Sequence, residues 1–180
     1  MKLFIAVYPK YNTLNALENA AESIREQSPE CRFVSRDMIH LTMAYIGEAG
    51  PNILASTIEA LDLVDLSAFN AKIDSTGRIG STAVAFLKKE PKLAELRKTL
   101  TDAMDRCGVP YDRRVFTPHI TLARNVPPDV IRPDIDADLS IDRLLLISSE
   151  IVDGRREYRE MYSRELKHEY VTLEKSDMRG

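Results

Sequence analysis

The sequence is short of several features that would place it in a special class. It has two cysteines, Cys31 and Cys107, which form no CxxC pair and no disulfide framework, so a reducing, cytoplasmic environment is predicted. Its longest apolar runs, such as residues 144–147, are far too short to cross a bilayer. The N-terminal residues indicate a strand rather than a signal peptide, and no membrane association is expected.

Positive charge is not in excess either. The 180 residues contain 25 Lys and Arg against 28 Asp and Glu, which gives a formal net charge of −3. This balance argues against a protein that coats long nucleic acid.

The remaining composition is that of a globular protein. Hydrophobic residues make up 44% and charged residues 29% of the chain, which is ordinary for a soluble protein that buries a core. The length predicts a single domain over residues 1–180, either one globular unit or two lobes that share one core.

Segments with strand-like and helix-like patterns alternate along the chain. Expected strands are residues 2–8, 39–46, 69–73, 82–87, 116–123, 144–152 and 158–166, the last two joined by a turn at Asp153-Gly154. Expected helices carry apolar stripes over residues 14–24, from Pro51 to Leu61, and from Pro91 to Cys107, where Gly108 forms the C-cap. Residues 174–180 are expected to form a polar tail.

This order contains an internal repeat. A strand-helix-strand unit that ends near His40 is followed, about eighty residues later, by a second unit that ends near His119. A later strand follows each unit, near Phe69 and near Leu144. We therefore expect an α+β fold built from two sheets.

The second long strand of each unit contains the same pattern, His40-Leu41-Thr42-Met43 and His119-Ile120-Thr121-Leu122. Alternate side chains of a strand point to opposite faces. Each strand would therefore direct a histidine and a threonine to one face and two apolar side chains to the core.

Two such strands facing one cleft would suit in-line displacement at phosphorus. An imidazole with a pKa of about 6.5 both gives and takes protons near neutrality, and threonine hydroxyls hydrogen-bond phosphate oxygens. With three His and ten Thr in the chain, two chance His-x-Thr pairs are about a one-in-a-hundred event. His168 has no such partner and is predicted to be a surface histidine.

These motifs resemble those of the 2H phosphoesterase superfamily, and within it the RNA 2′,3′-cyclic phosphodiesterases, also called 2′-5′ RNA ligases. Residues 3–7, 40–48 and 116–124 are similar to the first strand and the two motif blocks of that family. Ser149-Glu150 and residues 154–158 resemble its C-terminal hairpin. The chain departs from the family at Lys2, where Arg is common, and near Arg36, where Trp is common.

The resemblance implies a bilobal fold in which antiparallel sheets line a central cleft and helices lie outside. It implies hydrolysis of a 2′,3′-cyclic phosphate at an RNA end to a 2′-phosphate, with no metal and no cofactor. If the family's roles apply to this chain, His119 accepts a proton from water and His40 donates a proton to the leaving oxygen. Pseudo-symmetry also allows the two roles to be exchanged. Thr42 and Thr121 are expected to bind phosphate oxygens.

Several other side chains are candidates for substrate binding. Arg124 lies five residues beyond His119, so a bend in the strand is needed to bring it to the phosphate. Phe4 and Tyr45 are candidates for stacking on the terminal base, with core packing as the alternative for both. The pair Arg113-Arg114 either steers an RNA backbone or forms an ordinary solvated turn.

Two other functions fit the same motifs. RNA ligation could be the main activity, or the chain could be a nucleotide-binding module without turnover. The expected partner is an RNA end with a cyclic phosphate, tRNA fragments included, or a cyclic nucleotide, and a monomer is expected. Residues 76–124 contain ten basic and five acidic side chains, and this local excess suits a cleft for one phosphorylated RNA end.

Overall fold

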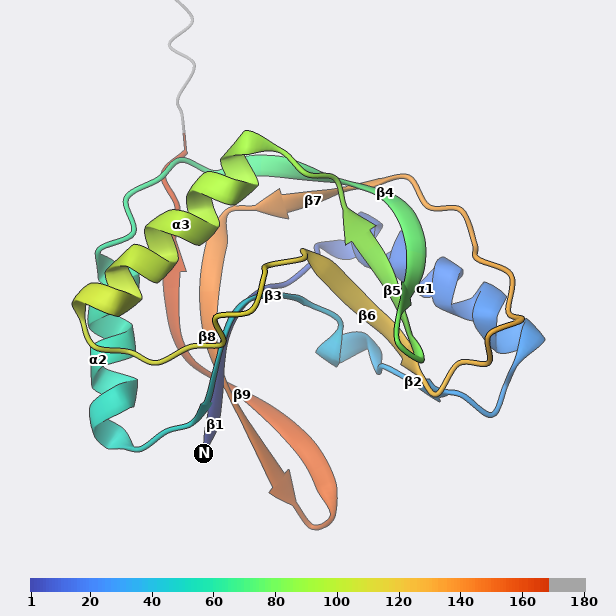
Figure 1. Ribbon diagram of the computed structural model, residues 1–180, viewed down its shortest axis with the longest axis horizontal. Coiled ribbons are helices and arrows are strands. Elements are labelled where there is room, and N and C mark those ends of the chain that lie inside the picture. Colours follow the sequence, from blue (N-terminus) through green and yellow to red (C-terminus); the bar gives the residue numbers. More distant parts are fainter. Residues whose placement is uncertain (169–180) are drawn as a thin grey trace, which may run out of the picture.

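The computed structural model describes residues 1–168 (Figure 1). In chain order its elements are β1 (Lys2–Val7), α1 (Tyr11–Gln27), β2 (Arg32–Phe33), the 3-10 helix η1 (Arg36–Met38), β3 (Leu41–Glu48), α2 (Pro51–Asp62), β4 (Phe69–Ile79), β5 (Thr82–Leu87), α3 (Pro91–Arg106), β6 (His119–Arg124), β7 (Ala137–Ile141), β8 (Arg143–Val152) and β9 (Arg155–Glu165). The predicted polar tail, residues 174–180, lies outside the described residues. None of the described helices combines the length and the hydropathy that crossing a membrane requires.

The strands form one curved sheet in the order β7-β4-β5-β6-β3-β1-β8-β9, with β2 paired to β6. Every pairing between these strands is antiparallel. The sheet is strongly curved, with α2 and α3 together on one side and α1 on the other (Figure 1). The predicted α+β class, with antiparallel strands and outer helices, is confirmed. The expectation of two sheets was wrong: all strands belong to one continuous sheet, because β3 of one half pairs with β6 of the other.

The sheet is narrowest where its two halves meet. β3 and β6 share a single residue pair, Leu41 with Ile120. On one side of this junction lie β7, β4, β5 and β6, and on the other lie β3, β1, β8 and β9. The junction thus joins two lobes at the point where each predicted motif begins.

The repeat units exchange their later strands. β4 follows β3 in sequence but pairs with β5 of the other lobe. In the same way β8, which comes after β6, pairs with β1. The sequence predicted the later strands near Phe69 and Leu144 but not their exchange between lobes.

Most predicted elements are confirmed, and the exceptions have local reasons. The α3 stripe is buried at Leu93, Leu96, Leu100 and Ala103, and Gly108 ends the helix with a φ of 69°. β4 runs to Ile79 rather than to residue 73, because its polar second half is held by backbone pairing to β5. β2 and β7 were not predicted. β2 has only two residues. β7 does alternate between apolar and polar side chains, but this short signal follows a segment rich in proline and aspartate and was missed.

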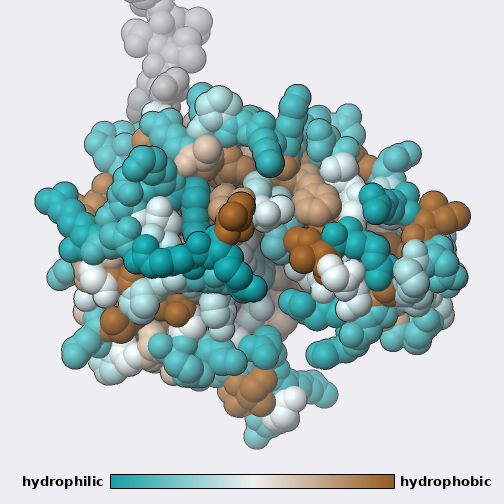
Figure 2. All heavy atoms as spheres, viewed as in Figure 1, coloured by the Kyte–Doolittle hydropathy of each residue, from teal (hydrophilic) through white to brown (hydrophobic). Residues whose placement is uncertain are grey.

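The face of the molecule seen in Figure 2 is mainly hydrophilic. Hydrophobic side chains emerge singly or in small groups, among them Ile151 and Val152 at the tip of the β8–β9 hairpin. Asp153 and Gly154 form the hairpin turn with positive φ values of 50° and 77°, which is the turn that the sequence predicted.

A glycine in β4 lets an aromatic ring lie beside the second motif. Phe86 of β5 is in register with His119 of β6, and its ring covers Gly77 of β4. A Cβ atom added at Gly77 would lie 2.6 Å from Cε2 of Phe86, closer than van der Waals contact permits. Gly77 is therefore required for this position of Phe86.

We expect Gly77→Ala to lower the free energy of unfolding by about 1–3 kcal/mol, as overpacking does. The variant Gly77→Ala/Phe86→Leu removes the clash, so it should lose less stability than the two single variants added together. Urea denaturation of all four proteins measures this coupling. A Gly77→Ala protein as stable as the parent would contradict the close contact.

Candidate active site

The two motifs meet across the junction of the sheet. Leu41 and Ile120 are fully buried and paired, so the residues on either side of them point away from the core. Antiparallel register places His40 beside Thr121 and Thr42 beside His119. Each histidine therefore lies next to the threonine of the other motif, as twofold pseudo-symmetry requires.

Both imidazole rings are held in the same way. Nδ1 of His40 lies 2.7 Å from the carbonyl oxygen of Met38, and Nδ1 of His119 lies 2.7 Å from that of Thr117. Because a carbonyl oxygen only accepts hydrogen bonds, Nδ1 is the protonated nitrogen in both rings. Nε2 is then the atom free to exchange a proton, and in His40 it lies 3.0 Å from Oγ1 of Thr42.

Three aromatic rings surround His40. Phe4 stacks on the imidazole with ring centroids 4.9 Å apart and an interplanar angle of 28°. Tyr158 meets it edge-on at 5.7 Å, and Tyr8 lies tilted at 5.7 Å. Phe4 is 4% exposed, so its ring is largely covered by His40 and its other neighbours.

Tyr8 and Tyr158 were not among the predicted site residues. The signal for Tyr8 was present, since Phe4, Ala6 and Tyr8 alternate along β1 and share one face. Phe4 and Ala6 pack with Leu145 and Ile147 in a small apolar cluster, against which Tyr8 and Tyr158 lie. This cluster is separate from the main core and forms the floor beneath His40.

The environment of His40 disfavours its charged form. Burial among the aromatic rings is the main cause that lowers the pKa of His40. The positive charges of His119 and Arg124 lower this pKa further, while the hydrogen bond to the Met38 carbonyl opposes the shift. His40 is therefore a neutral imidazole at neutral pH in the free protein.

A β-bulge brings Arg124 to the face of the motif. Ala83 to Val84 is one step along β5, but their partners on β6 are Ala123 and Thr121, which leaves Leu122 as an extra residue. Leu122 and Ala123 are consequently both buried, so the alternation of side chains between the two faces of β6 is shifted by one residue after the bulge. Arg124 thus faces the same side as Thr121, by the bend that the sequence analysis required.

A second bulge does the same for Tyr45. Thr42 pairs with Ala6 and Ala44 pairs with Ile5, so Met43 is the extra residue of β3. Tyr45 emerges on the face of Thr42 with 43% of its surface exposed. Of the two aromatic candidates, Tyr45 is therefore the one with an accessible ring.

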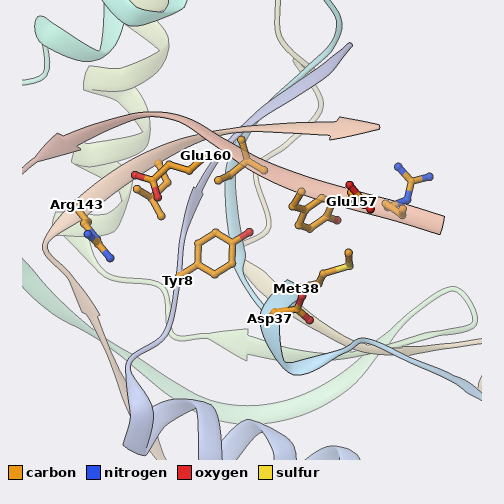
Figure 3. A pocket seen from close by; sticks show the side chains of 10 residues that line it. Tyr8, Asp37, Met38, Arg143, Glu157 and Glu160 are labelled. Carbon is orange, nitrogen blue, oxygen red and sulfur yellow. The ribbon is translucent and has the colours of Figure 1, made fainter. Parts of the chain in front are cut away.

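Two cavities flank the histidine pair. One, of about 340 Å³, is bordered by Thr42, Tyr45, Val115, Phe116 and His119. The other, of about 540 Å³, lies beside His40, and Tyr8 and Met38 line it together with Tyr158 and Arg156 (Figure 3). The arrangement leaves room for a ligand on each side of a phosphorus atom held between the histidines.

Both Arg113 and Arg114 are engaged by carboxylates. Arg113 pairs with Asp105 at 2.6 Å and Arg114 with Asp112 at 2.6 Å. The Arg114 guanidinium also lowers the pKa of Asp112 to about 2. The two charges that sequence analysis considered for RNA steering are thus partly neutralised in the protein.

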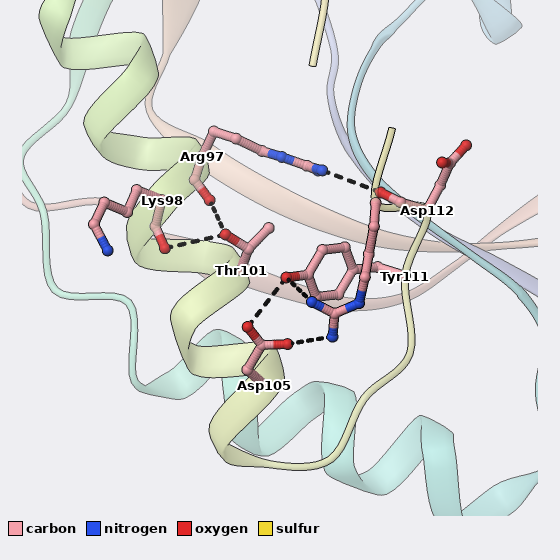
Figure 4. Close-up of polar contacts among 7 residues, drawn as sticks. Arg97, Lys98, Thr101, Asp105, Tyr111 and Asp112 are labelled. Carbon is pink, nitrogen blue, oxygen red and sulfur yellow. Dashed lines mark hydrogen bonds and ion pairs between the residues drawn. The ribbon is translucent and has the colours of Figure 1, made fainter. Parts of the chain in front are cut away.

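Arg97 of α3 fixes the wall of the smaller cavity. It donates to the carbonyl oxygen of Met43, the bulged residue. It also donates to the carbonyl oxygen of Asp112 at 3.3 Å, as Figure 4 shows. Its guanidinium also lies 4.9 Å from the ring centroid of Phe116. One side chain therefore ties β3 to the loop that leads into His119.

In the described part of the chain, the side chains that could bind a metal ion do not form a cluster. Among residues 1–168, no group of three or more His, Cys, Asp or Glu side chains is arranged to hold a metal ion. His168 is exposed, as predicted. Cys31 is buried and Cys107 is half-buried, and neither forms a disulfide.

The chain is similar in sequence to a known protein family and to several of its members. A sequence profile described as the 2′-5′ RNA ligase superfamily matches residues 14–150. The chain is 29% identical over 140 residues to the RNA 2′,3′-cyclic phosphodiesterase of Escherichia coli, covering 71% of this chain and 75% of that protein. It is 30% identical over 142 residues to the anti-CBASS protein Acb1 of phage T4, covering 78% of this chain and 84% of that protein.

A third relative is longer than this chain. The RNA 2′,3′-cyclic phosphodiesterase of Geobacillus stearothermophilus is 29% identical over 128 residues, which are 67% of this chain and 41% of that protein. The chain thus matches about two fifths of the length of this relative.

Solved structures show the same fold. The Escherichia coli LigT structure in complex with ATP superposes with a TM-score of 0.79 at 22% identity, covering 93% of this chain and 98% of LigT. The protein TT0787 of Thermus thermophilus superposes with a TM-score of 0.81 at 23% identity, covering 94% and 100% of the two chains. With its profile match and its two His-x-Thr strands, the chain belongs to the 2′-5′ RNA ligase superfamily of 2H phosphoesterases.

Proposed function

We propose that this protein is a metal-independent RNA 2′,3′-cyclic phosphodiesterase that leaves a 2′-phosphate. The observation that carries the proposal is the matched anchoring of His40 and His119, whose Nδ1 atoms both bond to backbone carbonyls. This leaves two Nε2 atoms on the cleft face of one sheet junction. The names of the Escherichia coli and Geobacillus relatives support the same activity.

In the proposed reaction His119 acts as the base. Its Nε2 takes a proton from water as the water oxygen attacks phosphorus. The bond from phosphorus to O3′ breaks, and His40 gives its Nε2 proton to that oxygen. The product is a 2′-phosphate, and proton exchange with solvent restores both rings.

The remaining site residues hold the substrate. Thr42 and Thr121 hydrogen-bond the non-bridging phosphate oxygens, and Arg124 balances their charge. Tyr45, with its exposed ring, stacks on a base. Phe4 is covered by His40, so we assign it to positioning that imidazole instead of to stacking on a base.

The donor role of His40 depends on the substrate. Burial keeps His40 neutral in the free protein, whereas a proton donor must be charged. The anionic cyclic phosphate opposes this shift, because a nearby negative charge favours the imidazolium. His40 therefore takes up its proton as the substrate binds.

RNA joining is the second candidate function. The cavity beside His119, bordered by Tyr45 and Val115, lies on the side from which the proposed nucleophile enters. A 5′-hydroxyl held there would attack phosphorus in place of water. Hydrolysis is favoured as the main activity unless a second RNA end occupies this cavity, since water is always present.

We expect His40→Ala and His119→Ala each to lower kcat about 10²- to 10⁴-fold, the usual effect of losing one acid or base. The assay follows opening of a 2′,3′-cyclic nucleotide and of a short cyclic-phosphate RNA, with EDTA present throughout. His168→Ala, at an exposed histidine, is the matched control and should retain full activity.

The same assay separates the alternatives. A rate close to that of the parent in either variant would remove that histidine from catalysis, and loss of activity in EDTA would contradict the metal-independent reaction. Tight nucleotide binding without turnover would identify a binding module.

An NMR titration of the imidazole should report the environment of His40. Because burial lowers the pKa of His40, its titration midpoint in the free protein should lie below pH 6.5, the ordinary histidine value. Tyr158→Ala removes a ring that covers His40, so this midpoint should move to higher pH. Tyr158→Phe keeps the ring and should leave the midpoint in place. A midpoint that Tyr158→Ala does not move would contradict this cause.

A substrate with a good leaving group distinguishes the two histidines. In the reverse direction, the 3′-hydroxyl of a nucleoside 2′-(4-nitrophenyl phosphate) attacks phosphorus, with His40 as base and His119 as acid. Nitrophenolate leaves without a proton, so His119→Ala should be nearly as active as the parent protein on this ester. On the corresponding methyl ester, which needs a proton donor, it should be strongly impaired. If His40→Ala is the variant spared on the nitrophenyl ester, the two roles are exchanged.

A further inference from the structure

Two arginines lie directly opposite each other near the proposed site. Arg32 of β2 is in antiparallel register with Arg124 of β6, and both residues are exposed. Side chains opposed in this way have Cβ atoms about 4.5–5.5 Å apart. Like charges at such a position repel each other and destabilise the pairing, so the pair calls for a functional reason.

Both side chains face the cleft. The neighbouring pair in the register, Phe33 with Ala123, belongs to the core face. Successive side chains alternate between faces, so Arg32 and Arg124 share the opposite face. On this face Arg124 is close enough to His40 for its charge to help lower the pKa of the imidazole.

The repulsion is not relieved by nearby acids. Within the part of the chain that the structure describes, neither Arg32 nor Arg124 forms an ion pair. Arg113 and Arg114, by contrast, each have a carboxylate partner. Two adjacent guanidinium groups with free donors form a ready site for phosphate oxygens.

The backbone holds Arg32 in position without such a partner. The amide of Val34 donates to the carbonyl oxygen of Leu122 at 3.0 Å, which continues the pairing of the two-residue strand. On the core face, the Arg25 guanidinium lies 4.3 Å from the ring centroid of Phe33. The backbone position of Arg32 is therefore fixed before any ligand binds.

We propose that Arg32 binds the phosphodiester that precedes the terminal nucleotide of the substrate, next to Arg124 at the reacting phosphate. The proposal rests on the cyclic phosphodiesterase function given above. A 2′,3′-cyclic mononucleotide has no second phosphate, so Arg32 contributes nothing to its binding. The enzyme therefore selects the end of an RNA chain over a free cyclic nucleotide.

The test compares the dinucleotide ApA with a terminal 2′,3′-cyclic phosphate to adenosine 2′,3′-cyclic phosphate. Arg32→Gln should lower kcat/KM for the dinucleotide about 10- to 100-fold, the effect of losing a charge-assisted hydrogen bond, and leave the mononucleotide unchanged. The slope of log kcat/KM against log salt for the dinucleotide should become about 0.7 shallower. Arg32→Lys should fall between the two proteins, and Arg106→Gln, at an exposed arginine in the last turn of α3, should match the parent.

Calorimetric binding of the products keeps the inference separate from catalysis. ApA with a terminal 2′-phosphate should bind more weakly to Arg32→Gln than to the parent, while 2′-AMP should bind both equally. Equal losses for both ligands, or no loss for either, would overturn the role of Arg32. Binding that follows this pattern without turnover by the parent would overturn the proposed function and support the phosphate site.

Discussion

The single pairing of Leu41 with Ile120 is the constraint on which the site depends. No other residue pair joins β3 to β6, and each of these strands contributes one His-x-Thr motif to the same face. Burial of both apolar side chains fixes which face the histidines take, because a slip of one residue would turn them into the core. One pair of residues thereby places two imidazoles and two hydroxyls on one face of the sheet.

The residues around this junction set the chemistry of each ring. Backbone carbonyls orient both imidazoles, but within residues 1–168 only the His40 ring packs against aromatic rings. Burial among these rings lowers the pKa of His40, so in the proposed reaction the anionic substrate has to favour the charged form of its imidazole. Bulges at Met43 and Leu122 then turn Tyr45 and Arg124 toward the same face. The two motifs are related by pseudo-symmetry, but the residues around them differ, so their surroundings are not symmetric.

The sequence predicts the parts of this arrangement that depend on local patterns. The strands of both motifs, the turn at Asp153-Gly154 and the C-cap at Gly108 follow from alternation and turn chemistry. The exchange of β4 and β8 between lobes depends on long-range pairing and leaves no local mark. The pairing of Arg32 with Arg124 could not be predicted from the sequence for the same reason, since ninety-two positions separate the two residues.

The central claim is that His40 and His119 act on one phosphorus atom from opposite sides. A crystal structure with a nucleoside 2′,3′-vanadate tests it most directly, because vanadate adopts the five-coordinate geometry of the transition state. The account predicts Nε2 of each histidine within about 2.6–3.2 Å of an apical oxygen, one histidine at each apex. Vanadate bound to one histidine alone, with the other turned away, would contradict it.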